Sequence, residues 1–487
     1  MNTTPENIPK NLHVIGICGV AMSAIAIAFH KRGVNVTGSD KGFFPPVSTE
    51  LEKQGIKFYA GWHPENMSHL NSEDSVVMVG TASGSQNPET SLAKEKGLPM
   101  YSYPEILGKY FCKENSVVCS GTWGKTSSSA LISFVFEQSG LNPSYMFGGV
   151  SLSHESSAKL TDSKWSVFEG DEYKSSPTDP RAKFFHYKPT HLLLSAVSWD
   201  HADLYPTEND YFEAFKKLIS IIPADGLIVA CKDNQGVEKI ADSFTNHKVI
   251  YYGRKMPLAS LALSGIEDYY SYTNTKQSRD GISFTIEHNN QSWTVHSPML
   301  GLYQIENMTG CFAMAHKSGI KAEKITEAIS KFKGLRRRLE KRHEGDITVI
   351  DDIAHSPDKS RSVLSTLKSI YSGKVICVFE PNIGGRERGA VLKYDNAFND
   401  ADLVIIPRLT KLKVAENETD QPMEGDELAQ VISKTHSNTV YIEDDEKLVS
   451  RLVSEAKKDD VIAFLGSHGF RGMIEETVGK LTMINNQ

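Results

Sequence analysis

The sequence predicts an α/β protein of three domains, each with a mainly parallel sheet, and three observations lead to this prediction. Short apolar runs alternate with helical patterns along the chain, which is typical of parallel strands joined by helices. The chain has 487 residues, more than the roughly 250 to 300 at which a single hydrophobic core stops growing. The alternation also falls into three blocks, which we place at residues 1–113, 114–333 and 334–487.

The composition excludes several classes of protein. The chain carries 53 Lys and Arg against 60 Asp and Glu, a formal net charge of -7, and it has no basic stripe for a nucleic-acid backbone. The N-terminal stretch is polar, and no run of about 18 apolar residues occurs, so we expect a cytoplasmic protein that neither enters a membrane nor binds nucleic acid. The six cysteines are widely separated, which argues against a zinc site or a disulfide framework.

The first block opens with the pattern of a βαβ unit of the Rossmann-like kind. Residues 11–40 read as a strand to Ile17, a turn containing Gly16 and Gly19, a helix to about Arg32 and a second strand that ends at Asp40. Glycines at this turn would let the backbone approach a diphosphate at the helix N-terminus, and the acid could meet a sugar hydroxyl. The spacing departs from G-x-G-x-x-G, so a turn that serves only helix packing remains an alternative.

The second block begins with a sharper motif, "VVCSGTWGKTSSSALISF" at residues 117–134. An apolar strand leads into the turn GTWG, and a helix runs from Lys125 and Thr126 to about Gln138. In this setting backbone N–H groups and the helix dipole face an anion, the lysine reaches the outer phosphates, and the threonine hydroxyl can bind Mg²⁺. The motif predicts a nucleoside triphosphate site in a P-loop-type domain; the alternative is an ordinary glycine-rich turn with a surface lysine.

Two acidic clusters follow strands of the same block. Glu169 comes directly after one predicted strand, and Asp200 and His201 come after the next. Because the carboxyl ends of parallel strands share one edge of a sheet, these residues could lie beside the nucleotide loop and hold the metal that accompanies ATP. For any single acid, a helix cap or a solvated turn is an equally ordinary explanation.

Together these motifs resemble the Mur ligase family of peptidoglycan synthesis over nearly the whole chain. The resemblance is carried by "GTWGKT", "EGDEYKSS" and "DHAD" in the second block and by "LRRRLEKR" and "DDIAHSP" near the start of the third. It implies a Rossmann-like N-terminal domain that holds a UDP-sugar, a central ATPase, and a Rossmann-like C-terminal domain that binds the incoming amine. It also implies an ATP-dependent, ADP-forming C–N ligase that works with Mg²⁺ through an acyl phosphate.

Within the family, three segments favour one substrate pair. "GSDKGFFPPVSTELEKQGI", "DPRAKFFHYKPTHLLL" and "FEPNIGGRERG" are similar to members that join UDP-N-acetylmuramate to the tripeptide L-Ala-γ-D-Glu-meso-diaminopimelate in peptidoglycan recycling. One alternative is L-alanine as the amine, in de novo synthesis; another is a non-catalytic relative that binds nucleotide or UDP-sugar. A dinucleotide-dependent oxidoreductase would explain the first block but would leave the GTWGKT loop without a role.

The resemblance assigns roles residue by residue. The residues implied in catalysis are Lys125, Glu169, His201, Arg337, Arg338, Asp352 and His355. Those implied in ATP binding are Gly121, Thr122, Gly124, Lys125, Thr126, Ser127, Asn307, Arg338 and Asp351, and the metal ligands would be Thr126, Glu169 and His201. The UDP-sugar would meet Gly16, Gly19, Ser39 and Asp40. In the third domain, Arg386 or Arg388 could supply the charge for the incoming substrate that the family carries at the position of Asn382.

Several positions depart from the family pattern. Trp123 stands where the family has His or Asn, Ala196 where an Asn is common, Tyr303 where a His is usual, and Asn382 where we expect Arg. The Trp123 indole could place an aromatic ring over the nucleotide or sugar, whereas loss of a polar group beside the phosphates would weaken catalysis. Lys216, at the approximate position of a carbamylated lysine in some members, is interpreted as an ordinary lysine on a solvated helix face.

Overall fold

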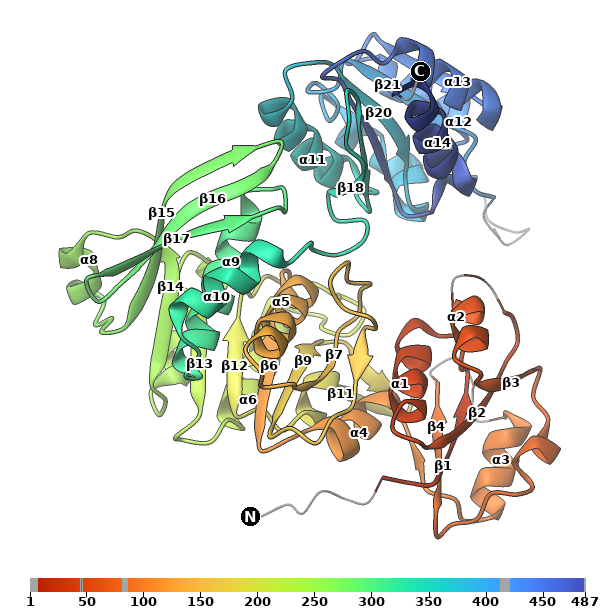
Figure 1. The fold of residues 1–487 in the computed structure, drawn as a ribbon, viewed down its shortest axis with the longest axis vertical. Helices are drawn as coiled ribbons and strands as arrows, with labels where there is room; N and C mark the ends of the chain where they lie inside the picture. Colours follow the sequence, from red (N-terminus) through yellow and green to blue (C-terminus); the bar gives the residue numbers. More distant parts are fainter. Residues whose placement is uncertain (1–7, 44, 46, 81–85, 412–420, 486–487) are drawn as a thin grey trace. The chain divides into compact units, whose positions relative to one another are not determined.

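The computed structural model describes residues 8–43, 45, 47–80, 86–411 and 421–485. Among these residues the main sheets have five, ten and six strands (Figure 1), which confirms the prediction of three α/β domains with parallel-rich sheets. The chain divides into two compact units. One contains the first sheet and most of the second, and the other contains residues 333–487 together with 275–283 and 297–304.

The first sheet is parallel, with the strand order β3-β2-β1-β4-β5. Its strand β1 ends at Ile15, two residues before the predicted end, because the amides of Gly16 and Ile17 both turn to the carbonyl of Ser39 at 2.8 and 3.1 Å. The helix α1 that follows has eight buried residues and ends before Gly33, whose φ of +83° favours glycine. The strands are Asn11–Ile15 (β1), Asn35–Asp40 (β2), Lys57–Ala60 (β3), Ser75–Val79 (β4) and Met100–Tyr101 (β5), and the helices are Val20–His30 (α1), Val47–Lys53 (α2), Pro88–Glu95 (α3) and Tyr103–Ile106 (α4).

The second sheet has the order β17-β16-β15-β14-β13-β12-β6-β9-β7-β8. Its parallel centre places the ends of β6, β9 and β12 side by side, which is the edge predicted to carry the nucleotide site. The strands are Asn115–Ser120 (β6), Ser144–Met146 (β7), Ala158–Lys159 (β8), Trp165–Gly170 (β9), His191–Leu194 (β12), Leu227–Cys231 (β13), Val249–Arg254 (β14), Tyr269–Ser278 (β15), Gly281–His288 (β16) and Gln291–Ser297 (β17); Lys174–Ser176 (β10) and Asp179–Ala182 (β11) form a separate pair. The helices are Lys125–Gln138 (α5), Glu208–Ser220 (α6), Gln235–Lys239 (α7), Leu258–Leu263 (α8), Tyr303–Lys317 (α9) and Ala322–Lys331 (α10).

The third sheet has the order β18-β19-β23-β20-β21-β22, in which only β18 pairs antiparallel. One core cluster joins the sheet to α11 and α12, and another joins it to α13 and α14, so helices cover both faces. The strands are Glu340–His343 (β18), Thr348–Asp352 (β19), Val375–Glu380 (β20), Leu403–Pro407 (β21), Thr439–Ile442 (β22) and Val461–Gly466 (β23). The helices are Pro357–Ile370 (α11), Gly425–Ser433 (α12), Asp445–Glu455 (α13) and Met473–Asn485 (α14).

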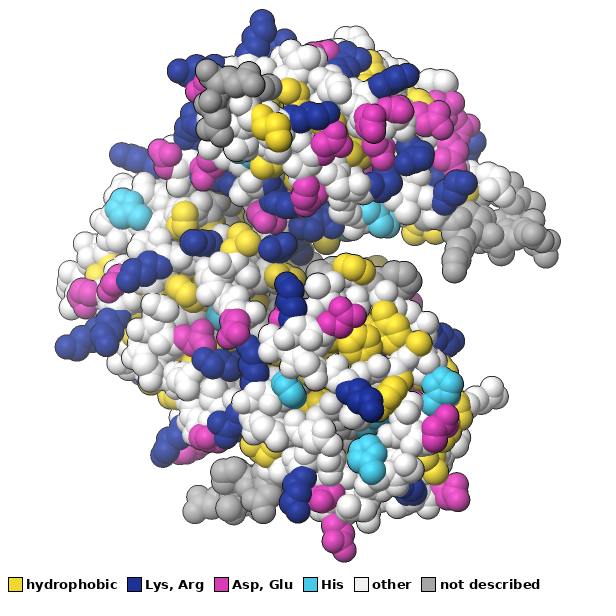
Figure 2. Space-filling view, turned by 45° about the vertical axis from the view of Figure 1, so that its right-hand side comes forward, with side chains coloured by type: hydrophobic (Ala, Val, Ile, Leu, Met, Phe, Trp, Pro, Cys, Tyr) yellow, Lys and Arg dark blue, Asp and Glu magenta, His cyan; other side chains and the backbone are white. Residues whose placement is uncertain are grey.

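The surface charge is mixed. On the face shown in Figure 2, basic and acidic side chains are interspersed, in keeping with the balance of charges in the sequence. Within the described residues, no helix is both long and apolar enough to span a membrane.

Candidate functional site

The loop between β6 and α5, residues 121–124, is predicted to bind nucleotide and is called the nucleotide loop below; its backbone has the shape of an anion-binding turn. Gly121 and Gly124 have φ values of +138° and +82°. A Cβ atom at Gly121 would lie 2.4 Å from Ser195 Oγ, and one at Gly124 would lie 2.5 Å from Asn307 Oδ1, so both positions require glycine. No side chain caps the N-terminus of α5, so its first amides can face a ligand.

The nucleotide loop is anchored to the segment that follows β12. The Thr122 amide donates to the carbonyl of Ala196 at 2.9 Å. The Thr122 hydroxyl donates to the carbonyl of Ser198 at 2.8 Å, and the Ser195 hydroxyl donates to the carbonyl of Trp123 at 2.5 Å. Because Ala196 acts here through its backbone, this anchor does not depend on the amide side chain that the family often has at that position.

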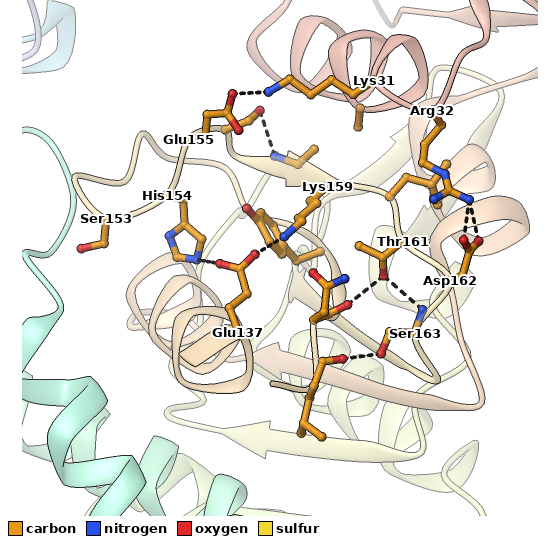
Figure 3. Close-up of a pocket in the computed structure, with 17 residues that line it drawn as sticks. Lys31, Arg32, Glu137, Ser153, His154, Glu155, Lys159, Thr161, Asp162 and Ser163 are labelled. Atoms are coloured by element: carbon orange, nitrogen blue, oxygen red, sulfur yellow. Dashed lines mark hydrogen bonds and ion pairs between the residues drawn. The ribbon is translucent and has the colours of Figure 1, made fainter. Parts of the chain in front are cut away.

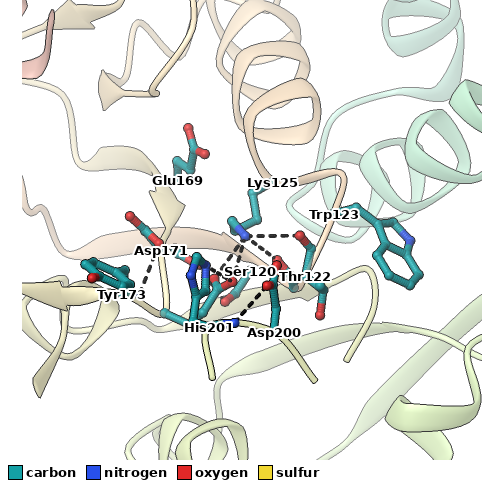
Figure 4. A network of polar contacts seen from close by, with 12 residues as sticks. Ser120, Thr122, Trp123, Lys125, Glu169, Asp171, Tyr173, Asp200 and His201 are labelled. Atoms are coloured by element: carbon teal, nitrogen blue, oxygen red, sulfur yellow. Dashed lines mark hydrogen bonds and ion pairs between the residues drawn. The ribbon is translucent and has the colours of Figure 1, made fainter. Parts of the chain in front are cut away.

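Lys125 is held by the protein itself. Its ammonium donates to the carbonyls of Gly121 and Thr122 at 2.7 and 3.3 Å, and it lies 2.9 Å from Glu172 Oε2. The Glu172 side chain is fully buried, and its Oε1 accepts from the Tyr211 hydroxyl at 3.2 Å. Glu172 therefore neutralises Lys125, the lysine that is predicted to meet the phosphates. Figure 4 shows Lys125 among the polar side chains of this edge, which include Asp171 and His201.

Thr126 and Glu169 form the part of the site that fits a magnesium ion. The Thr126 hydroxyl donates to Glu169 Oε1 at 2.7 Å, and the Gly148 amide donates to Oε2 at 2.5 Å. Burial raises the pKa of Glu169, although these two hydrogen bonds act against the rise. Oxygen atoms from a hydroxyl and a carboxylate are ligands that Mg²⁺ accepts, and both lie directly beside the nucleotide loop.

His201 lies near the same edge but is not part of a formed metal cluster. It has a φ of +54°, its amide donates to Asp200 Oδ1 at 2.7 Å, and its Nε2 is 3.7 Å from Glu172 Oε1. Across the described part of the chain, no three His, Cys, Asp or Glu side chains are grouped closely enough to hold a metal ion. The role of His201 as a metal ligand therefore stays a prediction.

Lys183 is a site residue that the sequence reasoning missed. It forms an ion pair with Asp171, and its ammonium lies 5.7 Å from the ring centres of both Tyr103 and Tyr173. Burial raises the pKa of Asp171, but the charge and hydrogen bond of Lys183 outweigh it, and the net shift is downward. Its segment, "AKFFHY", had served only to place the chain within the family, so a second lysine at this edge went unrecognised.

In the first domain, the predicted UDP-sugar residues form a connected turn. Gly16 has a φ of +88°, and Gly19 caps α1 without a side-chain hydrogen bond. Asp40 Oδ2 accepts from the amide of Cys18 at 2.9 Å and so holds the turn. Ser39 is fully buried and donates to Glu89, so its hydroxyl is engaged within the protein. Sugar binding by Ser39 and Asp40 stays a prediction.

In the second compact unit, Arg337 organises a backbone turn. Its guanidinium donates to the carbonyls of Gly466, Ser467 and His468 at 2.5, 3.1 and 2.8 Å and to Asp351 Oδ1 at 3.2 Å. Burial raises the pKa of Asp351, and Arg337 opposes this effect. Arg337 thus shapes the loop after β23 in the protein as it stands.

Three further predicted residues, Arg338, Asp352 and His355, belong to the same compact unit. Asp352 accepts from the amides of Leu339 and Ala354 at 2.7 and 2.8 Å, and burial raises its pKa. His355 Nδ1 lies 2.7 Å from the carbonyl of Ile353, an arrangement that requires a proton on Nδ1, and burial lowers its pKa. Arg338 is exposed, so its charge is more accessible than that of Arg337.

The side chain of Arg386 is buried and is not accessible to a ligand in this structure. It is 2% exposed, and it donates to the carbonyls of Met423 and Thr410 at 2.9 and 2.8 Å and to Glu424 at 3.0 Å. Arg388 is exposed and pairs with Glu427 at 3.0 Å. Substrate binding by Arg386 stays a prediction, and it would require these internal hydrogen bonds to exchange.

A separate cavity of about 610 Å³ lies at the far ends of α1 and α5 from their glycine turns (Figure 3). Its cations are paired: Lys31 with Glu155, Arg32 with Asp162, and Lys159 with Glu137, each at 2.6 Å. Because the cavity lies at the C-terminal ends of α1 and α5, where the helix dipoles disfavour an anion, it is a poorer phosphate site than the nucleotide loop at the N-terminus of α5.

Comparison with known proteins gives three matches in chain order. Residues 11–114 match the Mur ligase family catalytic domain, residues 119–315 the Mur ligase middle domain, and residues 337–468 the Mur ligase glutamate ligase domain. The chain is 30% identical to a UDP-N-acetylmuramate–L-alanine ligase of Xanthobacter autotrophicus over 97% of each chain. It is 28% identical to a UDP-N-acetylmuramate–L-alanyl-γ-D-glutamyl-meso-2,6-diaminoheptandioate ligase of Haemophilus influenzae over 97% of this chain and all of the relative. A solved UDP-N-acetylmuramate–alanine ligase from Thermotoga maritima shares the fold, with a TM-score of 0.75, 21% identity, and coverage of 97% of this chain and 99% of the other.

Proposed function

Because the chain belongs to the Mur ligase family of ATP-dependent amide ligases, we propose that it joins UDP-N-acetylmuramate to the tripeptide L-Ala-γ-D-Glu-meso-diaminopimelate. The bond would form between the lactyl carboxylate of the sugar and the amine of the tripeptide, in cytoplasmic peptidoglycan recycling. The observation that carries the ATP-dependent step of this proposal is the sheet edge beside the nucleotide loop, where Lys125 contacts the buried Glu172 and Thr126 contacts the half-buried Glu169.

The residues at this edge fit the electrostatic demand of the reaction. Transfer of a phosphoryl group to a carboxylate brings two anions together, so the site must supply positive charge in a fixed geometry. Lys125 and Lys183 bring two ammonium groups, and each is already held by a buried or half-buried acid. If phosphate or carboxylate oxygens of the substrates replaced those acids, both ammonium groups would contact the substrates. Because the two lysines are already largely shielded from water, this exchange would add little to their desolvation cost.

Mg²⁺, when bound, would neutralise negative charge on the phosphates. Thr126 and Glu169 would hold it, with His201 as the further predicted ligand, because their oxygen atoms lie beside the loop that receives the triphosphate. The bonds from Thr126 and Gly148 already orient the Glu169 carboxylate, so ligand binding would cost little side-chain ordering.

The remaining assignments follow the domain order. The first domain, residues 1–113, would bind the uridine diphosphate at the amides around Gly16 and Gly19. The central domain, residues 114–333, would bind ATP, and residues 334–487 would bind the amine. There Arg338 is an exposed cation, and the second ring nitrogen of His355 could accept a proton.

L-alanine is the second candidate for the amine, because a relative named as a UDP-N-acetylmuramate–L-alanine ligase is 30% identical to this chain over nearly its full length. The experiment incubates purified protein with UDP-N-acetylmuramate, ATP and Mg²⁺ and either the tripeptide or L-alanine. Phosphate release is followed and products are weighed by mass spectrometry. A product that depends on the tripeptide supports the proposal; a product only with L-alanine moves the chain to the de novo reaction; nucleotide binding without product supports the non-catalytic alternative.

A further inference from the structure

The side chain of Trp123 is exposed on a loop whose backbone is fixed. The residue is 52% exposed, although its carbonyl accepts from the Ser195 hydroxyl at 2.5 Å and the next residue, Gly124, lies against Asn307. A large aromatic side chain usually contributes through the area that it buries. Here the backbone of Trp123 is fixed, while much of the surface of its indole stays open to a ligand.

The indole also lies on a particular side of the loop. Figure 4 shows its ring turned away from Lys125, Glu169 and His201. If phosphoryl transfer occurs beside those residues, the terminal phosphate lies there, and the nucleoside leaves the loop on the other side. Two residues span at most about 7 Å of backbone, so the indole is close enough to Lys125 for one bound nucleotide to contact both.

We propose that Trp123 binds the adenine of ATP by stacking against it, an inference that rests on the proposed ATP-dependent function. The flat face of an indole matches the flat face of a base, and stacking of this kind tolerates any base because each has a π-face. Trp123 thus contributes to nucleotide affinity and adds little selectivity between bases. The loop amides and Lys125 bind the phosphates independently of the ring.

Because Trp123 would bind the base, and the loop amides with Lys125 the phosphates, one experiment can measure the two contributions to affinity separately. Isothermal titration calorimetry measures the affinity of wild-type protein and of Trp123→Ala for a non-hydrolysable ATP analogue with Mg²⁺ and, separately, for inorganic tripolyphosphate. Base–aromatic stacking predicts that the variant binds the analogue about 5- to 150-fold more weakly and binds tripolyphosphate as wild type does. Trp123→Phe, which keeps an aromatic face, should retain most of the affinity. Leu263→Ala, which truncates a 90% exposed apolar side chain elsewhere, is the matched control and should bind both ligands normally.

Three results would overturn the stacking proposal. Equal affinity of Trp123→Ala and wild type for the analogue removes any contact with the base. Equal weakening for both ligands means that the substitution disturbs the loop rather than the stacking. A raised KM for UDP-N-acetylmuramate with unchanged nucleotide affinity places the indole on the sugar. Each result leaves the proposed ligase activity intact, whereas a wild-type protein that binds neither nucleotide nor tripolyphosphate overturns that activity and the stacking together.

Discussion

Replacing Glu172 with glutamine tests whether the buried carboxylate holds Lys125 in readiness for phosphates. Glu172→Gln keeps the shape of the side chain and removes its charge. Lys125 would keep the carbonyls of Gly121 and Thr122 but lose its charged partner at 2.9 Å. We expect a less stable free protein that gains more from nucleotide than wild type does.

The magnitude follows from the burial of the pair. The side chains of Lys125 and Glu172 are 14% and 0% exposed, and removing one partner of a buried ion pair typically costs 3–5 kcal/mol. Because the lysine keeps two carbonyl acceptors and a little solvent, we expect the lower end, a loss of about 3 kcal/mol in the free energy of unfolding. Nucleotide phosphates replace the missing partner, so the analogue should bind the variant more tightly than wild type.

The assay is urea unfolding, with and without Mg²⁺ and the non-hydrolysable analogue, followed by tryptophan fluorescence. Glu213→Gln is the matched control, since Glu213 and Lys216 form an exposed pair at 3.4 Å, and such pairs contribute under about 1 kcal/mol. If Glu172→Gln unfolds at the same urea concentration as Glu213→Gln, or if nucleotide stabilises it no more than wild type, the reasoning is wrong.

Three other predictions follow from single side chains. Burial lowers the pKa of His154 to about 4, while its value in the unfolded chain is about 6.5, so the unfolded chain binds more protons between these two pH values. The free energy of unfolding should therefore fall by about 3 kcal/mol as the pH drops from 6.5 to 4. Urea midpoints measured across this range should fall less steeply in His154→Gln. Glu169→Gln removes the carboxylate beside the nucleotide loop, so addition of Mg²⁺ should no longer increase affinity for the ATP analogue in calorimetry, and product formation should fall by about 100-fold or more. Arg386→Ala leaves buried carbonyls without their donor and should cost about 3 kcal/mol, whereas the exposed Arg388→Ala should change urea unfolding little; equal midpoints for the two variants would show that Arg386 is not structural.

Strong local patterns allowed much of the fold to be predicted. The GTWGKT loop requires glycine where neighbouring groups approach within van der Waals distance, and the structure shows Ser195 and Asn307 at those two positions. The helix predicted to end at about Gln138 ends there. The strand predicted to reach Ile17 ends at Ile15 instead, because the next two amides donate hydrogen bonds to the carbonyl of Ser39 and form a turn. Apolar residues in a turn and in a strand look alike in sequence, so periodicity cannot fix such a boundary.

Local sequence patterns could not predict which side chains pair with the site residues. Glu172 meets Tyr211 across a separation of 39 residues, and the sequence gives no sign of this pairing. Arg386 was a candidate for the substrate because Asn382 stands where the family has Arg and a nearby arginine could supply that charge, yet tertiary packing encloses Arg386. A charge in a loop-like segment is equally compatible with either outcome, and only the chain that folds over it decides between them.

Glu169, near the end of β9, and the two acids that follow this strand show how the sheet edge organises charge before any substrate arrives. Glu169 faces the Thr126 hydroxyl, Asp171 pairs with Lys183, and Glu172 pairs with Lys125, so neighbouring carboxylates along the chain serve different partners. Each lysine thereby lies beside a carboxylate that balances its charge, so neither cation is left uncompensated before the anionic substrates bind. Since each lysine must exchange a carboxylate for a substrate oxygen, binding of the anions and release of the acids are coupled. Removing one acid should therefore change nucleotide affinity even where that acid touches no ligand, which is why Glu172→Gln is the most informative of these substitutions.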